Sequence, residues 1–333
     1  MTAPVRLAVV GAGLFTQKAH LPALLNLTDR FTIQVVCSRS LVSADKLATA
    51  IPHPVDVITD FNAVLARPDI DAVDLIVPIG TLPAMVEAAL AAGKHVISEK
   101  PAAPDVASGR RLLALPRRSV WMVAENCRYS ESVRRAAEIV QSGAIGKPIL
   151  CQWLRHAAVF KGIYYSTTWR RDNSFPGGFL LDGGVHDAAI LRTILGEITD
   201  VSAYMTQARP DLPPADTMSA AIHFANGCLG SYIVTYAGDS AYQHLITIVG
   251  DNGSLQVDPY QLDLTGVPGI TGELKMQFPD TMVQSELADF ADAIQSGKTP
   301  RSTPEQAVQD VAVFEAMLQS GQTDRAVSPE KIV

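Results

Sequence analysis

Short apolar runs of β-strand character alternate with helical segments between residues 5 and 123, and this alternation constrains the fold more than any other feature. Chains in which helices separate successive strands form parallel sheets with right-handed crossovers. We therefore predict that residues 1–126 form a doubly wound parallel sheet. Its strands are expected at 5–10, 31–37, 55–58, 72–77, 95–98 and 120–123, and its helices at 17–27, 43–50, 60–66, 82–92 and 105–115.

The rhythm changes after residue 126, where the β-type runs become longer. Two domains are typical of a chain of 333 residues. We predict an α/β protein whose second domain, residues 127–333, is an α+β domain with an open, mostly antiparallel sheet. Its strands are expected at 149–158, 197–206, 217–225, 228–236 and 243–249, and its helices at 130–141, 184–195, 281–296 and 304–319.

Composition argues against several classes of partner. The net charge is −7 and the 27 Lys and Arg residues are scattered, so neither nucleic acid nor a membrane surface is expected as a partner. No apolar run is long enough to span a bilayer, and the N-terminus lacks the pattern of a signal peptide. The four cysteines show neither zinc nor disulfide spacing. We expect a cytoplasmic protein with free thiols and no metal.

A glycine turn follows the first strand and opens a helix. It reads Gly11-Ala-Gly13-Leu14-Phe15-Thr16, close to the GxGxxG fingerprint that holds a dinucleotide pyrophosphate at a helix N-terminus. Thr16 occupies the third glycine position, which serves helix packing, so the phosphate site is retained. Two glycines alone could form an ordinary turn, but strand and helix flank them here. Gly11, Gly13, Leu14 and Phe15 are predicted to contact a nicotinamide dinucleotide.

The end of the second strand bears on the choice of coenzyme. NAD-binding proteins usually carry Asp or Glu there for the ribose 2′-hydroxyl, whereas this chain has Ser38-Arg39-Ser40. Arg39 and the two hydroxyls could bind a 2′-phosphate. The alternative is that Arg39 is a solvated surface residue. We predict NADP as the coenzyme, with NAD as the second choice.

The strand at 95–98 leads directly into Glu99-Lys100-Pro101. Ligands of doubly wound sheets bind beyond the carboxyl ends of the strands, so Lys100 is expected on the ligand side. Pro101 disfavours a helical conformation at Lys100. An ammonium group placed there could stabilise a developing alkoxide, although a solvated lysine at a strand end would give the same pattern.

Asp182 and His186 lie four residues apart in the glycine-rich segment 177–187, at the start of a predicted helix. This spacing puts both side chains on one helical face, where His186 could act as a general acid or base and Asp182 could orient it. The glycines at 177, 178, 183 and 184 would let a substrate approach the backbone. A metal pair and a purely structural helix start are the alternatives, and Asp187 fits the structural one.

The chain resembles the glucose–fructose oxidoreductase / inositol dehydrogenase / MocA (Gfo/Idh/MocA) family over nearly its whole length. The resemblance is carried by the glycine turn and by residues 92–101, 142–148, 177–187 and 249–255. It implies a Rossmann domain followed by an α/β domain, a nicotinamide cofactor, and sugar, polyol or inositol substrates. It also implies that Lys100, Asp182 and His186 are the catalytic residues, and that the C-terminal sheet forms a homodimer or homotetramer contact.

The resemblance adds binding residues and has two departures. Glu99, Lys100, Pro78 and the pair Trp169-Arg170 would face the cofactor. After the fourth strand many relatives read Thr-Pro-x-x-x-His, whereas residues 77–83 of this chain, Val-Pro-Ile-Gly-Thr-Leu-Pro, keep Pro78 and lack the histidine. Phe179 replaces the third glycine of a frequent triplet, which could narrow the site. Sugars suit aromatic walls with hydrogen-bonding groups, so the substrate candidates are Asn126, Arg128, Tyr129, Tyr164, Tyr165 and Trp169, any of which could instead be a packing residue.

Three functions fit these residues. The first is an NAD(P)-dependent oxidoreductase that transfers a hydride between the coenzyme and a small sugar, polyol or related cyclic alcohol or carbonyl. The second is a non-enzymatic regulator or sensor that binds a dinucleotide. The third is a glycosidase or lyase that oxidises a sugar carbon transiently and retains its cofactor. Keeping Lys100, Asp182 and His186 favours an enzyme over a sensor.

Overall fold

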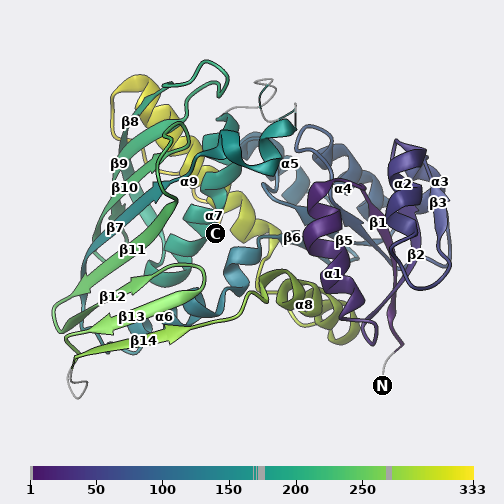
Figure 1. Cartoon of the computed structure of the whole chain (residues 1–333), viewed down its shortest axis with the longest axis horizontal. Coiled ribbons are helices and arrows are strands. Elements are labelled where there is room, and N and C mark those ends of the chain that lie inside the picture. Colours follow the sequence, from purple (N-terminus) through teal and green to yellow (C-terminus); the bar gives the residue numbers. More distant parts are fainter. Residues whose placement is uncertain (1–2, 168, 170, 172–176, 268–271) are drawn as a thin grey trace. The chain divides into compact units, whose positions relative to one another are not determined.

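The chain folds into two compact units. The structure, a computed structural model, describes residues 3–167, 169, 171, 177–267 and 272–333. The first unit comprises Met1–Asn126 and Val283–Val308, and the second comprises Cys127–Met282 and Gln309–Val333 (Figure 1). A division into 1–126 and 127–333 would place Val283–Val308 in the second unit, whereas this segment packs with the first.

The first unit is built on a six-stranded sheet in the order β3-β2-β1-β4-β5-β6, and each of its strand pairs is parallel. With right-handed crossovers, the chain winds outward in two directions from β1 and β4, which puts the connecting helices on opposite faces. The predicted doubly wound sheet is therefore confirmed. The strands are β1 (Val5–Val10), β2 (Phe31–Cys37), β3 (Asp56–Ile58), β4 (Ala72–Leu75), β5 (His95–Glu99) and β6 (Trp121–Ala124).

Polar side chains fix where several helices of this unit begin. Ser40, Asp60 and Asp105 each accept a hydrogen bond from a backbone N–H in the first turn that follows, which satisfies a donor that the helix itself cannot pair. The helical segments are η1 (Thr16–His20, a π-helix), α1 (Leu21–Leu25), α2 (Leu41–Ala48), α3 (Phe61–Leu65), α4 (Leu82–Ala91) and α5 (Val106–Leu113).

Helix α8 (Met282–Ser296) brings the chain back to the first unit. Its Phe290 is fully buried and stacks on Phe31 at the start of β2, with ring centroids 6.4 Å apart. Its Asp292 forms an ion pair with Arg30, just before the same strand. The returning segment therefore supplies part of the core on which this sheet packs.

The second unit is built on an eight-stranded sheet in the order β14-β13-β12-β11-β7-β10-β9-β8. Among the strands that the structure describes, β7 and β10 pair in parallel and the other neighbours are antiparallel, which confirms the predicted open, mostly antiparallel sheet. The strands are β7 (Pro148–His156), β8 (Ile198–Thr206), β9 (Thr217–Phe224), β10 (Leu229–Thr235), β11 (Gln243–Gly250), β12 (Gly253–Val257), β13 (Gln261–Thr265) and β14 (Glu273–Gln277).

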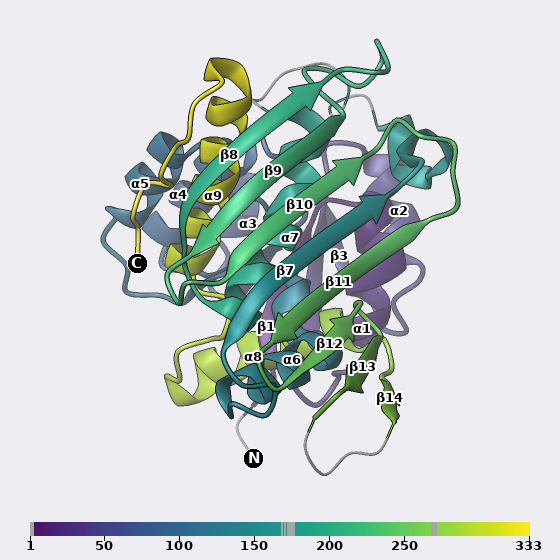
Figure 2. The same ribbon diagram turned by 90° about the vertical axis from the view of Figure 1, so that its left-hand side faces the viewer.

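Helix α7 (Gly178–Leu195) lies behind the strands of this sheet in Figure 2 and packs against α6 (Glu131–Gln141). Buried and exposed residues alternate along β9, as expected of a sheet with one covered face and one open face. The last helix, α9 (Pro304–Thr323), contributes the buried Phe314 to the second unit. No helix among the described residues combines the length and the apolar character that crossing a bilayer requires.

Candidate active site

The glycine turn after β1 has the shape that a pyrophosphate site needs. Gly11 has a φ of +105°, and a Cβ added to it would lie 2.0 Å from the carbonyl oxygen of Ile76. A Cβ added to Gly13 would meet nothing within 4 Å, so the space before the helix is open. Thr16 is fully buried, and its hydroxyl donates to the carbonyl of Gly11 over 2.8 Å. The departure from the fingerprint therefore holds the turn closed, and the residues fit a dinucleotide phosphate.

Several predicted cofactor residues lie at one edge of the first sheet. Ser38 follows β2, Pro78 follows β4, and Glu99 ends β5. Because the strands are parallel, their carboxyl ends meet at the same edge, beside the switch point between β1 and β4. Arg39 is exposed, whereas the hydroxyl of Ser40 accepts from the backbone N–H of Ser43. This edge carries Gly11, Gly13, Leu14, Phe15, Ser38, Arg39, Pro78, Glu99, Lys100 and Asn126.

A buried histidine, His20, lies beside Glu99 at this edge of the sheet. No sequence pattern singled it out. His20 has no exposed surface, and its Nδ1 lies 2.8 Å from Oδ2 of Asp74 in β4. Its Nε2 lies 3.1 Å from Oε1 of Glu99 in ion-pair contact, without the alignment of a hydrogen bond. Burial alone would lower the pKa of His20, but the hydrogen bond to Asp74 and the charges of Asp74 and Glu99 outweigh it and raise that pKa well above 6.5.

Glu286, on α8, is the second unexpected titratable group in the first unit. It is fully buried, and neither of its carboxyl oxygens has a hydrogen-bond partner within the described part of the chain. Burial raises its pKa well above 4.5; the charge of His20 opposes this rise, and those of Glu99, Glu125 and Asp74 add to it.

Asp182 and His186 lie on α7 in the second unit, well inside the helix rather than at its start. Their spacing puts them on one face, one turn apart, and Asp182 is buried while His186 is half-buried. Lys100 belongs to the first unit, where it is half-buried directly after β5. Asp182 and His186 are placed in the second unit where they could transfer a proton. Lys100 is placed in the first unit where it could stabilise a negative charge.

Asp187 anchors α7 to the sheet directly beside His186. It accepts from Nη1 of Arg155 on β7 over 2.8 Å and from the hydroxyl of Tyr232 on β10 over 2.7 Å. Burial raises the pKa of Asp187, although Arg155 and Tyr232 oppose that rise. A helix beginning near residue 184 would have put Asp187 in its first turn. The helix begins at Gly178 instead, so the carboxyl group of Asp187 is buried and tied to two strands.

The glycines of segment 177–187 serve packing, which corrects the expectation that they leave room for substrate. A Cβ added to Gly183 would lie 2.1 Å from the hydroxyl of Tyr236, and one added to Gly184 would lie 1.9 Å from the ring of Phe314. A Cβ on Gly178 would lie 2.1 Å from the carbonyl oxygen of Pro213. Protein atoms fill these spaces, so the glycines allow α7 to lie close to its neighbours.

Tyr236 and His244 are further polar groups near the Asp182 and His186 face of α7. The guanidinium of Arg155 lies 5.5 Å from the ring centre of Tyr236, whose buried hydroxyl lacks a partner among the described residues. Burial, together with the charges of Arg155 and His186, lowers the pKa of His244 to about 3. His244 is therefore a neutral hydrogen-bonding group. The signal in the sequence was a Tyr and a His at the ends of two predicted strands.

The predicted substrate residues lie in different surroundings. Arg128 is buried and paired with Asp310, which also pairs with Arg192, so its guanidinium is committed within the second unit. Tyr129 is buried as well. The other candidates are half-buried: Tyr164 in a 3₁₀ turn, Tyr165 with its hydroxyl donating to Asp211, Asn126, and Trp169. Arg170 lies outside the described residues.

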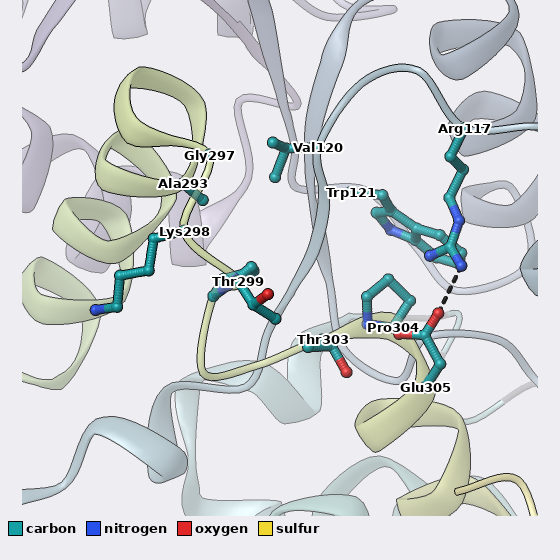
Figure 3. Close-up of a pocket in the computed structure, with 11 residues that line it drawn as sticks. Arg117, Val120, Trp121, Ala293, Gly297, Lys298, Thr299, Thr303, Pro304 and Glu305 are labelled. Carbon is teal, nitrogen blue, oxygen red and sulfur yellow. Dashed lines mark hydrogen bonds and ion pairs between the residues drawn. The ribbon is translucent and has the colours of Figure 1, made fainter.

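A pocket of about 240 Å³ lies elsewhere in the first unit (Figure 3). It is lined by Trp121 and by the segment between α8 and α9, and the ion pair of Arg117 with Glu305 lies at one side. Trp121 begins β6, so this pocket lies at the amino ends of the parallel strands. The glycine turn lies at the opposite edge, and the pocket is therefore not the dinucleotide site.

Two models of one oxidoreductase family match the chain. The NAD-binding Rossmann fold model matches residues 5–126, and the C-terminal alpha/beta domain model matches residues 137–328. The chain belongs to the Gfo/Idh/MocA oxidoreductase family. The resemblance seen in the sequence is thereby confirmed, and the chain is an NAD(P)-dependent dehydrogenase.

Similar proteins span the full length of this Gfo/Idh/MocA oxidoreductase. Dehydrogenase FPY6 of Fusarium mangiferae is 31% identical over 342 residues, which cover 96% of this chain and 97% of that protein. An oxidoreductase of Thermotoga maritima superposes with a TM-score of 0.91 at 33% identity, covering 99% of this chain and 100% of that chain. Levoglucosan dehydrogenase in complex with NADH and levoglucosan gives a TM-score of 0.89 at 22% identity, covering 98% and 100%, and this likeness concerns the fold alone.

Proposed function

We propose that this dehydrogenase oxidises a CH–OH group of a sugar, polyol or related cyclic alcohol, or reduces the corresponding carbonyl, with NADP preferred over NAD. The observation that carries the proposal is the placement of Asp182 and His186 on one face of α7. In the NAD-binding domain of the same chain, strand β5 ends at Glu99 and is followed by Lys100. An imidazole, a carboxylate and an ammonium group can supply the proton transfer and the charge stabilisation that alcohol oxidation needs beside a nicotinamide.

In the proposed reaction, His186 and Lys100 act on the substrate hydroxyl group directly, and Asp182 acts through His186. When bound, the nicotinamide supplies the acceptor for the hydride that leaves the carbinol carbon. His186 takes the hydroxyl proton as the C–O bond becomes a carbonyl, and Asp182 orients the imidazole. Lys100 stabilises the negative charge that develops on the substrate oxygen. In the reduction direction, His186 returns the proton to that oxygen.

Fold-level similarity and the residues of the second unit support the substrate class. The structure of levoglucosan dehydrogenase is a complex with NADH and levoglucosan, and here Tyr164 and Trp169 offer half-buried aromatic surface. Tyr236 and His244 add polar groups near His186. Aromatic surface with a few hydrogen-bonding groups is what a polyhydroxylated ring requires.

The preference for NADP rests on the exposed Arg39 between Ser38 and Ser40, where a carboxylate would repel a 2′-phosphate. The homodimer or homotetramer that we also propose rests on the open face of the second unit's sheet, where Leu150, Leu229 and Ile233 are 37%, 52% and 42% exposed. Apolar side chains gathered in this way are typical of an interface.

The test is coenzyme reduction across a panel of aldoses, inositols and anhydrosugars, with NADP and NAD compared. Lys100→Met should lower kcat on the best substrate at least about 100-fold while dinucleotide binding persists. Lys147→Met, at an exposed lysine before β7, is the matched control and should retain full turnover.

Three outcomes would contradict the proposal. Full turnover by Lys100→Met would remove the mechanism. Cleavage of the sugar without net change of coenzyme would indicate the glycosidase or lyase instead. Dinucleotide binding with neither outcome across the panel would indicate the sensor.

A further inference from the structure

His20 lies in an unusual stretch of helix. The helix after the glycine turn adopts π-type hydrogen bonding over Thr16–His20 and returns to α-helix at Leu21. Pro22 has no N–H to donate to the preceding turn, so the regular ladder is interrupted at this point. Single π-turns are rare in proteins, and those that occur often lie at functional sites. Here the π-turn delivers a fully buried imidazole beneath the coenzyme edge of the sheet.

His20 joins two neighbouring strands through their carboxylates. Asp74 belongs to β4 and Glu99 to β5, and these strands pair side by side. Asp74 is 1% exposed, whereas the side chain of Glu99 is 12% exposed. Glu99 therefore extends from the buried imidazole to the carboxyl edge, where it is followed by Lys100.

The protonation of His20 is important because several carboxyl groups surround its imidazole ring. The titratable groups that face the cluster are Asp74, Glu99, Glu125 and Glu286. Burial raises the pKa values of both Glu286 and Asp74. His20, when protonated, is a cation in contact with the carboxyl groups of Asp74 and Glu99. Since a buried ion pair is a poor device for stability compared with apolar packing, a role at the exposed end of Glu99 accounts better for its presence.

We propose that His20 is a positioning residue for coenzyme binding: held by Asp74, it fixes the orientation and the negative charge of Glu99, which accepts hydrogen bonds from hydroxyl groups of the coenzyme. This inference rests on the proposed function in one respect, namely that the coenzyme lies at the edge carrying Glu99. It adds a buried residue to the site and makes coenzyme affinity dependent on the protonation of His20.

The experiment is a double-mutant cycle read out as the Kd for NADPH, or for NADH if NADP proves not to bind, without substrate. His20→Asn keeps a donor towards Asp74 but loses both the charge and the reach to Glu99. We expect His20→Asn and Glu99→Gln each to weaken binding about tenfold. The double variant should bind no more weakly than Glu99→Gln alone, because His20 acts through Glu99.

The pH dependence is the second readout. In the wild type, binding should weaken as pH rises through the elevated pKa of His20, because loss of the imidazolium releases Glu99. The Kd of His20→Asn should show no such step between about pH 6 and about pH 10. His95→Asn is the matched control, since His95 is half-buried at the amino end of the same strand β5, where its Nδ1 accepts from Val120. It should bind and titrate like the wild type.

Additive losses in the double variant, or an unchanged Kd and pH profile in His20→Asn, would overturn the inference and leave the proposed function intact. A wild-type protein that binds neither dinucleotide would refute the proposed coenzyme and this inference with it. If His20→Asn does not fold in urea-unfolding controls, the pH profile of Glu99→Gln decides. A lost step supports the inference, and a retained step overturns it.

Discussion

Thr16 illustrates at the residue scale how a glycine fingerprint tolerates a change. Its hydroxyl binds the carbonyl of Gly11 across the turn, and its side chain is fully buried between helix and sheet. Gly11 has no such freedom, since its φ is positive and any side chain would collide with Ile76. The turn is therefore fixed by one obligatory glycine and one hydrogen bond, and the space before Gly13 stays open.

Arg39 is the residue at which coenzyme choice should be reversible. Arg39→Asp replaces a cation that suits a 2′-phosphate with a carboxylate that suits the 2′-hydroxyl. We expect the ratio of kcat/KM for NADP to that for NAD to fall at least about tenfold. Steady-state kinetics with both coenzymes measures this ratio. An unchanged ratio would show that Arg39 is only a solvated surface residue.

Glu286 should make the protein less stable as pH rises. Burial raises its pKa well above 4.5, so the folded protein keeps a proton that the unfolded chain has already lost. Between the two pKa values, each pH unit removes about 1.4 kcal/mol from the free energy of unfolding. Glu286→Gln cannot titrate, so its stability relative to the wild type should improve by that amount per unit. Urea unfolding at a series of pH values measures it, and parallel curves would contradict it.

Residues whose partners are distant in the chain could not be assigned from the sequence. Arg128 looked like a substrate ligand because it follows the last Rossmann strand, yet Asp310 binds it from 182 positions away. His20 looked like any helical histidine, because its partners Asp74 and Glu99 come from other strands. In contrast, the turn at Gly11 and the shared helical face of Asp182 and His186 could be predicted, since a turn and a helical spacing are local properties.

Helix α7 shows at the element scale how tertiary packing overrides local propensity. Glycine disfavours helix, so the glycines of segment 177–187 suggested a helix beginning near residue 184. The helix instead begins at Gly178. Glycines are needed within it because close neighbours, such as the ring of Phe314, leave no room for larger residues. The shift moved Asp182 and Asp187 from a helix end to its interior.

Gly184→Ala should test this packing directly. Alanine favours helix by about 1 kcal/mol over glycine, but its Cβ would lie 1.9 Å from the ring of Phe314. We expect a net loss of about 1–3 kcal/mol in the free energy of unfolding, measured by urea denaturation. Gly80→Ala is the control, since a Cβ there meets nothing within 4 Å. Equal stability of Gly184→Ala and the wild type would show that Phe314 moves aside readily.

The elements themselves followed from local pattern to different degrees. Alternation of strands and helices predicted all six strands of the first sheet and the parallel pairing between them. The strands β12, β13 and β14 were missed, although they are no shorter than several strands of the first sheet. They follow one another with no helix between them, so the alternation that marked the short strands of the first sheet is absent here.

At the scale of the whole molecule, the open face of the second sheet carries a stripe of apolar side chains that runs across strands. Leu150, Leu229 and Val249 are aligned by register, and so are Leu154, Ile233 and Leu245. An apolar stripe on an open sheet face is the kind of surface that a two-fold interface would bury. Figure 2 shows these strands, β7, β10 and β11, side by side at the front.

Ile233→Glu should reduce the oligomeric state. A charge at the centre of the stripe would be buried unpaired in the interface, which is strongly unfavourable. We expect this variant to be a monomer by size-exclusion chromatography with light scattering, and the wild type to be a dimer or tetramer. Leu41→Glu is the control, because Leu41 is 54% exposed on α2 of the first unit. A wild type that is itself monomeric, or an Ile233→Glu variant of unchanged mass, would contradict the interface.

The return of Val283–Val308 to the first unit has a consequence for biosynthesis. When the ribosome has translated the first 126 residues, Phe31 has emerged without the ring of Phe290 that will cover it. The nascent sheet must wait for more than 150 further residues, including all eight strands of the second sheet, before its last helix arrives. Folding during synthesis is therefore interleaved, with the unit that starts first finishing late.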